Sequence, residues 1–339
     1  MTIMRTERVS FFSRGLRLAG LWRRPDWADQ RLPTIVQGPG WLGLKEARLY
    51  VRYHEALTEA GFAVLVFDYR GSGESEGDRT LLSPRNQLED LVAAVSYIRG
   101  RDDVDPERLG VFGTGGTGGG NAVLLAGQDS RVTAAVSQVP VADGADWLHR
   151  MRSEEEWLDF LRDLEEDRLR RAVAGKGRLV DPREAIMVAT SERRTSSVKS
   201  DVDGRAPDQV SLESADEILE YRPLDAARGL RTPLLVIGVE GDAVTPTDHA
   251  VSLYREAAGP CTLLMQRYAT HYGAYERHWS QVTPQIVDWF RRHLVSGEVS
   301  VRARTGAGEP ESSGWLSPSG HLGTRDAREN SAGEARDLG

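Results

Sequence analysis

An aspartate and a histidine, the residue types of a general base and its carboxylate partner, follow two apolar segments late in the chain. Asp242 follows the segment PLLVIGVEG, and His271 follows the segment CTLLMQRYAT. A carboxylate that accepts a hydrogen bond from one imidazole nitrogen sets the tautomer of the ring, and the other nitrogen is then free to take a proton. The sequence therefore predicts that Asp242 and His271 act together as the acid and base of a catalytic site.

A glycine-rich segment is a second candidate for chemistry. Gly113 to Gly120 (GTGGTGGG) lies between an apolar run, RLGVF, and a helix-like run, NAVLLAG. A strand, a glycine turn and a helix build either a phosphate-binding loop or the sharp turn that carries a nucleophile. A P-loop needs a lysine after its last glycine, where this chain has Asn121, so the nucleophile turn is favoured.

The elements that position these residues follow from the apolar pattern. Strand-like and helix-like runs alternate through residues 1–142 and again through 225–295, after two short runs that predict an N-terminal hairpin. This alternation is typical of an α/β fold, a doubly wound and mostly parallel sheet with helices on both faces. The charged helical segment 143–224 interrupts the series and is predicted to be an inserted helical cap. Residues 296–339 contain few large apolar side chains and are predicted to be a disordered tail.

Several segments together resemble a known family. GFAVLVFDYRGSGESEG, DVDPERLGVFGTGGTGGGNAVLLAG, LLVIGVEGDAVTP and ATHYGAY are similar to segments of the capped α/β-hydrolases of the respiration-switch (FrsA/YcjY-like) and dihydroxypseudooxynicotine-hydrolase group. A nucleophile turn, then an Asp, then a His is also the chain order of α/β-hydrolase triads. The resemblance implies cleavage of an ester, amide or carbon–carbon bond by an elbow serine, without a cofactor or metal. It also implies that Asp242 is the triad acid and His271 the base.

The chain departs from this family at the nucleophile. Its glycine-rich segment contains no serine, and the serine position falls on Gly115 or on Gly116, depending on the alignment. Thr117, next to Gly118, offers a hydroxyl only if the alignment with the family's serine is shifted toward it. An elbow nucleophile has a positive φ angle, which a β-branched residue tolerates poorly and glycine adopts freely, so Thr117 needs a relaxed loop to serve.

A second departure lies in the loop that supplies a backbone donor to the oxyanion. Relatives have His-Gly there, whereas this chain has Gln37-Gly38-Pro39-Gly40-Trp41. Pro39 has no N–H to donate, so the donor is expected from Gly40 or Trp41. Gln37 and Trp41 are either substrate contacts or packing residues of the loop. His149 of the cap is a further candidate substrate contact, and Tyr272 and Tyr275 beside His271 are expected to line the pocket or brace the histidine.

Composition limits the classes of partner. Forty-three basic and 51 acidic residues give a net charge of −8 and no basic stripe, which argues against nucleic acid. The single cysteine, Cys261, has no neighbour at metal-ligand spacing, and no apolar run is long enough to cross a membrane. We therefore expect a cytoplasmic protein that binds a small molecule, with a homodimer as an open possibility.

Three functions remain open from the sequence. The first is hydrolysis of an ester, thioester or carbon–carbon bond in a small organic carbonyl compound. The second is a non-hydrolytic lyase, cyclase or isomerase in which His271 and Asp242 move a proton and backbone N–H groups hold an oxyanion. The third is a binding protein that has lost catalysis.

Overall fold

The computed structural model describes residues 4–187, 190–195 and 204–295. The predicted tail, 296–339, lies outside the described residues. The strands of the main sheet are β1 (Met4–Ser13), β2 (Leu16–Pro25), β3 (Leu32–Gly38), β4 (Ala63–Phe67), β5 (Val104–Thr114), β6 (Val132–Gln138), β9 (Leu234–Val239) and β10 (Cys261–Gln266).

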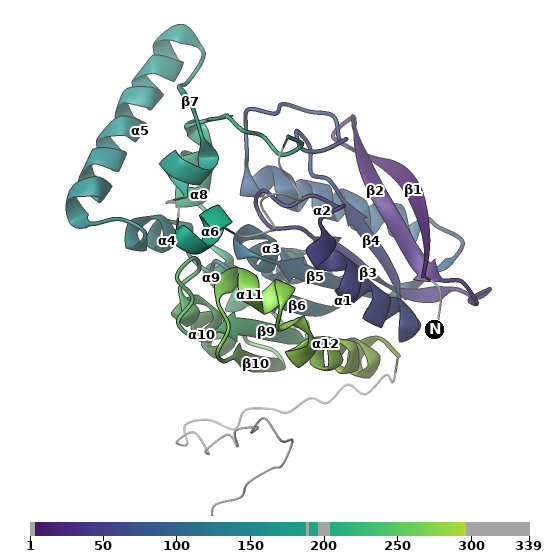
Figure 1. The fold of residues 1–339 in the computed structure, drawn as a ribbon. Helices are drawn as coiled ribbons and strands as arrows, with labels where there is room; N and C mark the ends of the chain where they lie inside the picture. Colours follow the sequence, from purple (N-terminus) through teal and green to yellow (C-terminus); the bar gives the residue numbers. More distant parts are fainter. Residues whose placement is uncertain (1–3, 188–189, 196–203, 296–339) are drawn as a thin grey trace, which may run out of the picture. The chain divides into compact units, whose positions relative to one another are not determined.

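These strands form one sheet in the order β1-β2-β4-β3-β5-β6-β9-β10 (Figure 1). The strands from β4 to β10 run parallel, and β1 and β2 join them antiparallel at one edge. The predicted N-terminal hairpin is confirmed, with Arg14 and Gly15 in its turn at φ angles of 51° and 83°.

Helices cover both faces of the sheet (Figure 1). They are α1 (Arg48–Glu59), α2 (Pro84–Arg99), α3 (Gly116–Gln128), α10 (Thr247–Glu256), α11 (His271–Glu276) and α12 (Thr283–Phe290). Successive strand residues point to opposite faces, so Ile35 and Phe112 pack under α1 and α12 while Val36 and Val111 pack under α2 and α3. Burial on both faces explains why these strands are continuous apolar runs, and the predicted doubly wound α/β fold is confirmed.

The segment between β6 and β9, called here the insertion (residues 143–224), is mostly helical. It comprises α4 (Gly144–Arg150), α5 (Glu154–Ala174), β7 (Leu179–Val180), the π-helix η1 (Pro182–Ile186), α6 (Ser191–Thr195), β8 (Val210–Ser211), α8 (Glu213–Leu219) and the start of α9 (Pro223–Ala227). α5 begins with a capping box in which Ser153 and Glu156 bond each other's backbone N–H groups. Trp147, Phe160 and Ile218 form a core of the insertion that also takes in Trp41 from the loop after β3. The insertion therefore packs directly on the loop in which an oxyanion donor is expected.

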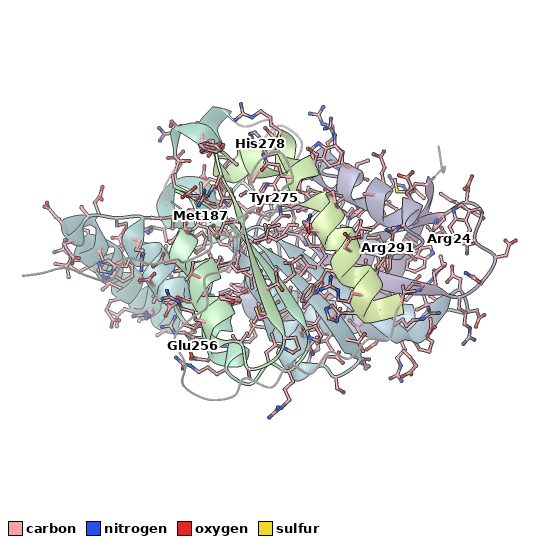
Figure 2. The ribbon with its side chains drawn as sticks, turned by 90° about the horizontal axis from the view of Figure 1, so that it is seen from below. Arg24, Met187, Glu256, Tyr275, His278 and Arg291 are labelled. Carbon is pink, nitrogen blue, oxygen red and sulfur yellow. The ribbon has the colours of Figure 1, made fainter. Side chains whose placement is uncertain are left out.

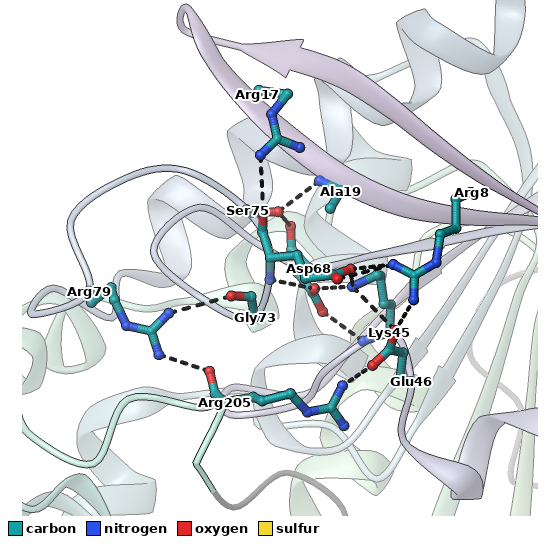
Figure 3. Close-up of polar contacts among 11 residues, drawn as sticks. Arg8, Arg17, Ala19, Lys45, Glu46, Asp68, Gly73, Ser75, Arg79 and Arg205 are labelled. Carbon is teal, nitrogen blue, oxygen red and sulfur yellow. Dashed lines mark hydrogen bonds and ion pairs between the residues drawn. The ribbon is translucent and has the colours of Figure 1, made fainter.

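A buried ion pair holds the far end of this loop. Lys45 Nζ lies 2.5 Å from Asp68 Oδ2 and 2.7 Å from Glu74 Oε2, and the Lys45 backbone N–H donates to Asp68 Oδ1 at 2.9 Å. Lys45 and Asp68 are each only 1% exposed. Arg8 binds Glu74 at the outer side of the same cluster (Figure 3). The loop from Pro39 to Lys45 is therefore tied to the end of β4.

Replacing Lys45 with Met is expected to lower the free energy of unfolding by about 3–5 kcal/mol, because it leaves the Asp68 carboxylate buried without its partner. Urea denaturation followed by circular dichroism measures this. Arg8→Met is the matched control, since it removes an exposed cation from the same cluster and should cost about 1 kcal/mol or less. A loss for Lys45→Met no larger than that for Arg8→Met would contradict the expectation.

Candidate active site

Asp242 and His271 lie in contact at the carboxyl ends of two adjacent strands. Asp242 belongs to the loop after β9, and His271 is the first residue of α11, which follows β10. His271 Nδ1 lies 2.8 Å from Asp242 Oδ2, and both side chains are buried. The other carboxylate oxygen, Oδ1, accepts the backbone N–H groups of Val244 at 2.7 Å and Thr245 at 2.9 Å. Asp242 is thus held by its own loop with one oxygen directed at the imidazole.

The surroundings of Asp242 favour its charged form. Burial on its own would raise the pKa of this carboxyl group, but His271 and the backbone N–H groups of Thr245 and Val244 outweigh it, and the pKa is lowered. The carboxylate therefore stays ionised and can hold the Nδ1 proton of His271. The Nε2 atom is left to exchange a proton with a substrate or with water.

Gly115 occupies the sharp turn between β5 and α3. Its φ of 72° and ψ of 153° lie in a region that glycine alone adopts readily. Of the two alignments left open by the sequence, the turn position is therefore Gly115, and Gly116 is the first residue of the helix. A Cβ placed on Gly115 would lie 3.6 Å from Gly40 Cα and 3.8 Å from Tyr275 Oη, which is ordinary van der Waals separation. A small side chain at this position would therefore fit without a clash, beside the pocket that Gly115 lines.

The structure does not bring Thr117 to this pocket. Thr117 is fully buried, its hydroxyl donates to Gln87 Oε1 at 3.1 Å, and its carbonyl accepts the Tyr221 hydroxyl at 3.0 Å. As the second residue of α3 it points into the packing between helices, because the helix has already rotated it away from the turn. Gly118 also lies below the surface, since a Cβ there would meet the Pro39 carbonyl oxygen at 2.5 Å.

Two backbone segments flank the turn. Gly116 is the first residue of α3, so its N–H has no partner within the helix. Opposite it, Gly43 N–H bonds Gly40 O at 2.9 Å and closes a turn around Trp41. Gly40 contacts the turn directly, because a Cβ on it would lie 3.1 Å from Thr114 O and 3.6 Å from Gly115 Cα. Gly116 and the Gly40–Trp41 segment therefore lie on two sides of the turn.

A pocket with a cavity volume of about 130 Å³, partly open to solvent, lies over these groups. This volume is below the roughly 300–1,000 Å³ of drug-sized sites, so the pocket suits a small ligand or one part of a larger one. Its described lining consists of Gly40, Trp41, Leu42, Gly43, Ala47, Leu49, Tyr50, Thr114, Gly115, Gly116, Trp147, Arg183, Met187, Val244, Thr245, His271, Tyr272 and Tyr275. Figure 2 shows Met187 of the insertion and Tyr275 of α11 at the same end of the sheet. The insertion therefore supplies part of the pocket wall.

Two predicted substrate contacts lie elsewhere. Gln37 is fully buried under the site, where its Nε2 donates to Thr114 Oγ1 at 3.1 Å. His149 lies on the surface of the insertion, where its Nε2 is 3.0 Å from Glu154 Oε1 and its ring is tilted against that of Trp157 with centroids 4.8 Å apart. Neither belongs to the described pocket lining: Gln37 takes the packing role that the sequence left open, and His149 lies outside the pocket at which a substrate contact was expected.

The predicted tyrosines do line the pocket. The ring of Tyr272 lies 4.8 Å from that of His271, and the ring of Tyr275 lies 5.7 Å from it, both edge-on. Burial raises the pKa of Tyr275 well above its ordinary value, and its hydroxyl has no hydrogen-bond partner among the described residues. Tyr275 therefore presents a protonated donor beside Gly115.

Several lining residues escaped the sequence analysis. Thr114 lay within the glycine-rich motif but was not singled out. Tyr50, whose pKa burial raises to about 12, comes from α1 and had no local signal. Thr245 lies three residues after Asp242, and its buried hydroxyl has no partner in the described part of the chain. Arg183 comes from the insertion, where nothing in the sequence marked it.

The insertion also contacts the histidine helix. Glu192 Oε1 of α6 accepts the backbone N–H groups of Tyr272 at 3.1 Å and Gly273 at 3.4 Å. An anion at this end of α11 satisfies N–H groups that the helix leaves free. These hydrogen bonds join the insertion to the helix that carries the base.

Within residues 4–187, 190–195 and 204–295, no three His, Cys, Asp or Glu side chains lie together as a metal ion would require. None of the helices in these ranges has the length and apolar character needed to cross a membrane.

Comparisons with known proteins agree with this fold. The family model of X-Pro dipeptidyl-peptidases (S15 family) matches residues 15–273. An uncharacterized 31.7 kDa protein of the traX-finO intergenic region of Escherichia coli is 31% identical over 267 residues, which cover 77% of this chain and 91% of that protein. The thiohydrolase aneE of Aspergillus aculeatus is 34% identical over 130 residues, 38% of this chain and 39% of that enzyme.

A solved structure shows the same fold. The crystal structure of the α/β-hydrolase GrgF from Penicillium sp. sh18 superposes with a TM-score of 0.72 at 22% identity, covering 86% of this chain and 99% of that one. The family model and this likeness in fold together confirm the α/β-hydrolase superfamily predicted from the sequence motifs. The chain belongs to the X-Pro dipeptidyl-peptidase (S15) family and is an α/β-hydrolase.

Proposed function

We propose that this protein hydrolyses a small organic ester or thioester with a water molecule that His271 activates directly. One observation carries the proposal: the Asp242–His271 pair lies at a pocket that is also lined by Gly115, the glycine of the turn, which has no side chain to act as a nucleophile. A water molecule in that pocket takes the place of the serine hydroxyl of other α/β-hydrolases. No covalent intermediate on the protein then forms.

The reaction follows from the groups in the pocket. His271 Nε2 takes a proton from water while the water oxygen bonds to the substrate carbonyl carbon. The Gly116 N–H and an N–H of the Gly40–Trp41 turn hold the negative oxygen that forms. The imidazolium, stabilised by Asp242, then gives its proton to the departing alcohol or thiol, and the acid product remains. The name of the relative aneE, a thiohydrolase, supports thioesters within the substrate class.

The test combines turnover with a search for an adduct. We expect wild-type protein to hydrolyse members of a panel of activated aryl esters and thioesters, and to incorporate one ¹⁸O atom from labelled water into the acid in a single turnover. Intact-protein mass spectrometry should find no acyl or fluorophosphonate adduct. His271→Ala should lower kcat/KM by about 100-fold or more, since general base catalysis is lost.

His149→Ala is the matched control, because this histidine is exposed and lies outside the described pocket lining. Its kcat/KM should remain within about twofold of wild type, as for other surface substitutions. An adduct on wild-type protein would contradict attack by water, and peptide mapping would then locate the nucleophile.

Proton transfer without hydrolysis is the second candidate. The observation that favours it is Tyr275, a buried hydroxyl with a raised pKa and no partner among the described residues, which can donate to an enolate oxygen while His271 takes the α-proton. NMR distinguishes the two functions. Exchange of a substrate α-proton for deuterium in D₂O, without release of acid, supports lyase, cyclase or isomerase chemistry, and release of acid without exchange supports hydrolysis.

A further inference from the structure

Arg183 is a cation that faces the pocket without a partner. It lies in η1 of the insertion and is partly buried. Among the described lining residues it alone has a permanent charge. No acidic side chain in the described part of the chain forms an ion pair with it, whereas most arginines of the insertion, such as Arg168 and Arg171, bind carboxylates.

The backbone that carries Arg183 is held firmly. Asp181 accepts the Arg183 N–H at 2.7 Å, and Pro182 and Ile186 are buried on either side. Arg152 donates to the carbonyls of Ala185 and Ile186, each at 2.9 Å. The backbone of Arg183 is therefore held in place beside the pocket that this residue lines.

Arg152, the other arginine beside this segment, has a different environment from Arg183. Burial lowers the pKa of Arg152 to about 10, and its guanidinium lies 3.8 Å from the centre of the Phe160 ring. Its donors are taken up by backbone carbonyls, including Leu148 O at 2.8 Å. Arg152 thus braces the segment, and Arg183 keeps its donors for a ligand.

The rest of the pocket strengthens any charge pair made there. Trp41, Trp147, Met187 and Val244 form apolar walls, and the other polar lining groups are neutral or are the histidine itself. An ion pair beside apolar walls is screened less than one on the surface. A planar guanidinium also matches a carboxylate through two parallel hydrogen bonds.

We infer that Arg183 binds a carboxylate group of the substrate, remote from the carbonyl at which the reaction occurs. The substrate class is then an ester or thioester that also carries a free carboxylate. One guanidinium balances one negative charge, which suits a carboxylate better than a doubly charged phosphate. Hydrolysis of such an ester or thioester rests on the proposed function, but binding of the carboxylate by Arg183 does not.

Binding is measured first, with probes that cannot react. Tryptophan fluorescence, reporting on Trp41 and Trp147, follows titration with 4-phenylbutanoate and with its neutral analogue 4-phenylbutanamide. Wild-type protein should bind the carboxylate about 10-fold more tightly, and Arg183→Met should lose this preference, as expected for a hydrogen-bonded charge pair. Arg162→Met, which removes an exposed arginine of α5, is the matched control and should keep it. Equal affinity of wild type for the two probes, or binding of neither, overturns the inference.

Turnover is measured second, with the mono-4-nitrophenyl ester of glutaric acid and with the neutral methyl 4-nitrophenyl diester. Arg183→Met should lower kcat/KM about 10- to 100-fold for the charged ester and about twofold or less for the neutral one, and Arg183→Lys should restore part of the loss. Hydrolysis of both esters without a preference overturns the inference and leaves the proposed function standing. A binding preference without hydrolysis of either ester supports the carboxylate site and counts against the proposed function.

Discussion

Replacing Gly115 with Ser is expected to create a serine nucleophile that a fluorophosphonate labels at least about 100-fold faster than it labels wild-type protein. The new Cβ has room, with Gly40 Cα at 3.6 Å and Tyr275 Oη at 3.8 Å as its nearest neighbours. Asp242 already orients His271 as a general base, so a triad at this turn lacks the nucleophilic hydroxyl that the serine would add. The backbone strain of a serine at positive φ should cost about 1–3 kcal/mol of stability.

Two variants make this result decisive. Gly115→Ala has the same strain without a hydroxyl, so it should unfold at nearly the same temperature and remain unlabelled. Gly115→Ser combined with His271→Ala should be labelled slowly, because the hydroxyl then lacks its base. Tryptic mapping has to find the label on residue 115. A folded Gly115→Ser protein that stays unlabelled would mean that His271 Nε2 does not reach the turn.

Replacing Asp242 with Asn is expected to lower kcat by about 1,000- to 10,000-fold with little effect on the fold. The reason lies in the hydrogen bonds of this side chain. The backbone N–H groups of Val244 and Thr245 both donate to Oδ1, so the asparagine oxygen will face them and its amide group will face His271. The amide then donates to Nδ1, the proton moves to Nε2, and the nitrogen in the pocket can no longer act as a base.

Asp225→Asn is the matched control. Asp225 has the same change of charge but lies on an exposed helix end, 3.0 Å from Arg228. Its kcat should stay within about twofold of wild type. Steady-state kinetics on the best ester of the panel measure both variants, and circular dichroism checks that both are folded. A loss below about tenfold for Asp242→Asn would remove the pair from the mechanism.

Local sequence patterns were enough to predict the acid and the base, because the order and direction of the strands decide where these residues lie. Asp242 and His271 each follow an apolar strand, and the carboxyl ends of parallel strands meet at one edge of a sheet. The same rule brings Gly115, after β5, to that edge. No knowledge of packing was needed, since alternation of strands and helices already implies the parallel arrangement.

The candidate residues that the structure places outside the described pocket lining depend on finer placement. Gln37 lies two residues after Ile35 on β3, so its side chain is on the same face of the sheet as Ile35. It is buried there against Thr114 and does not enter the pocket. Thr117 lies two positions after the turn residue Gly115, inside α3. Each residue of an α-helix turns the side-chain direction by about 100°, so Thr117 points away from the pocket. His149 was assigned to the pocket because it belongs to the insertion, but it lies on the surface of that segment.

The sequence by itself determined the α/β fold, the order of the turn, acid and base along the chain, and the loss of serine from the turn. Each of these features depends on residue type, spacing and chain order, which can be read directly from the sequence. Only the tertiary structure decided that Gly115 and not Gly116 is the turn residue, and that Tyr50 and Arg183 enter the pocket. These facts depend on where a helix begins to within one residue and on contacts between segments far apart in the chain. Local propensity does not specify such contacts, because packing of the whole core selects among near-equal local alternatives.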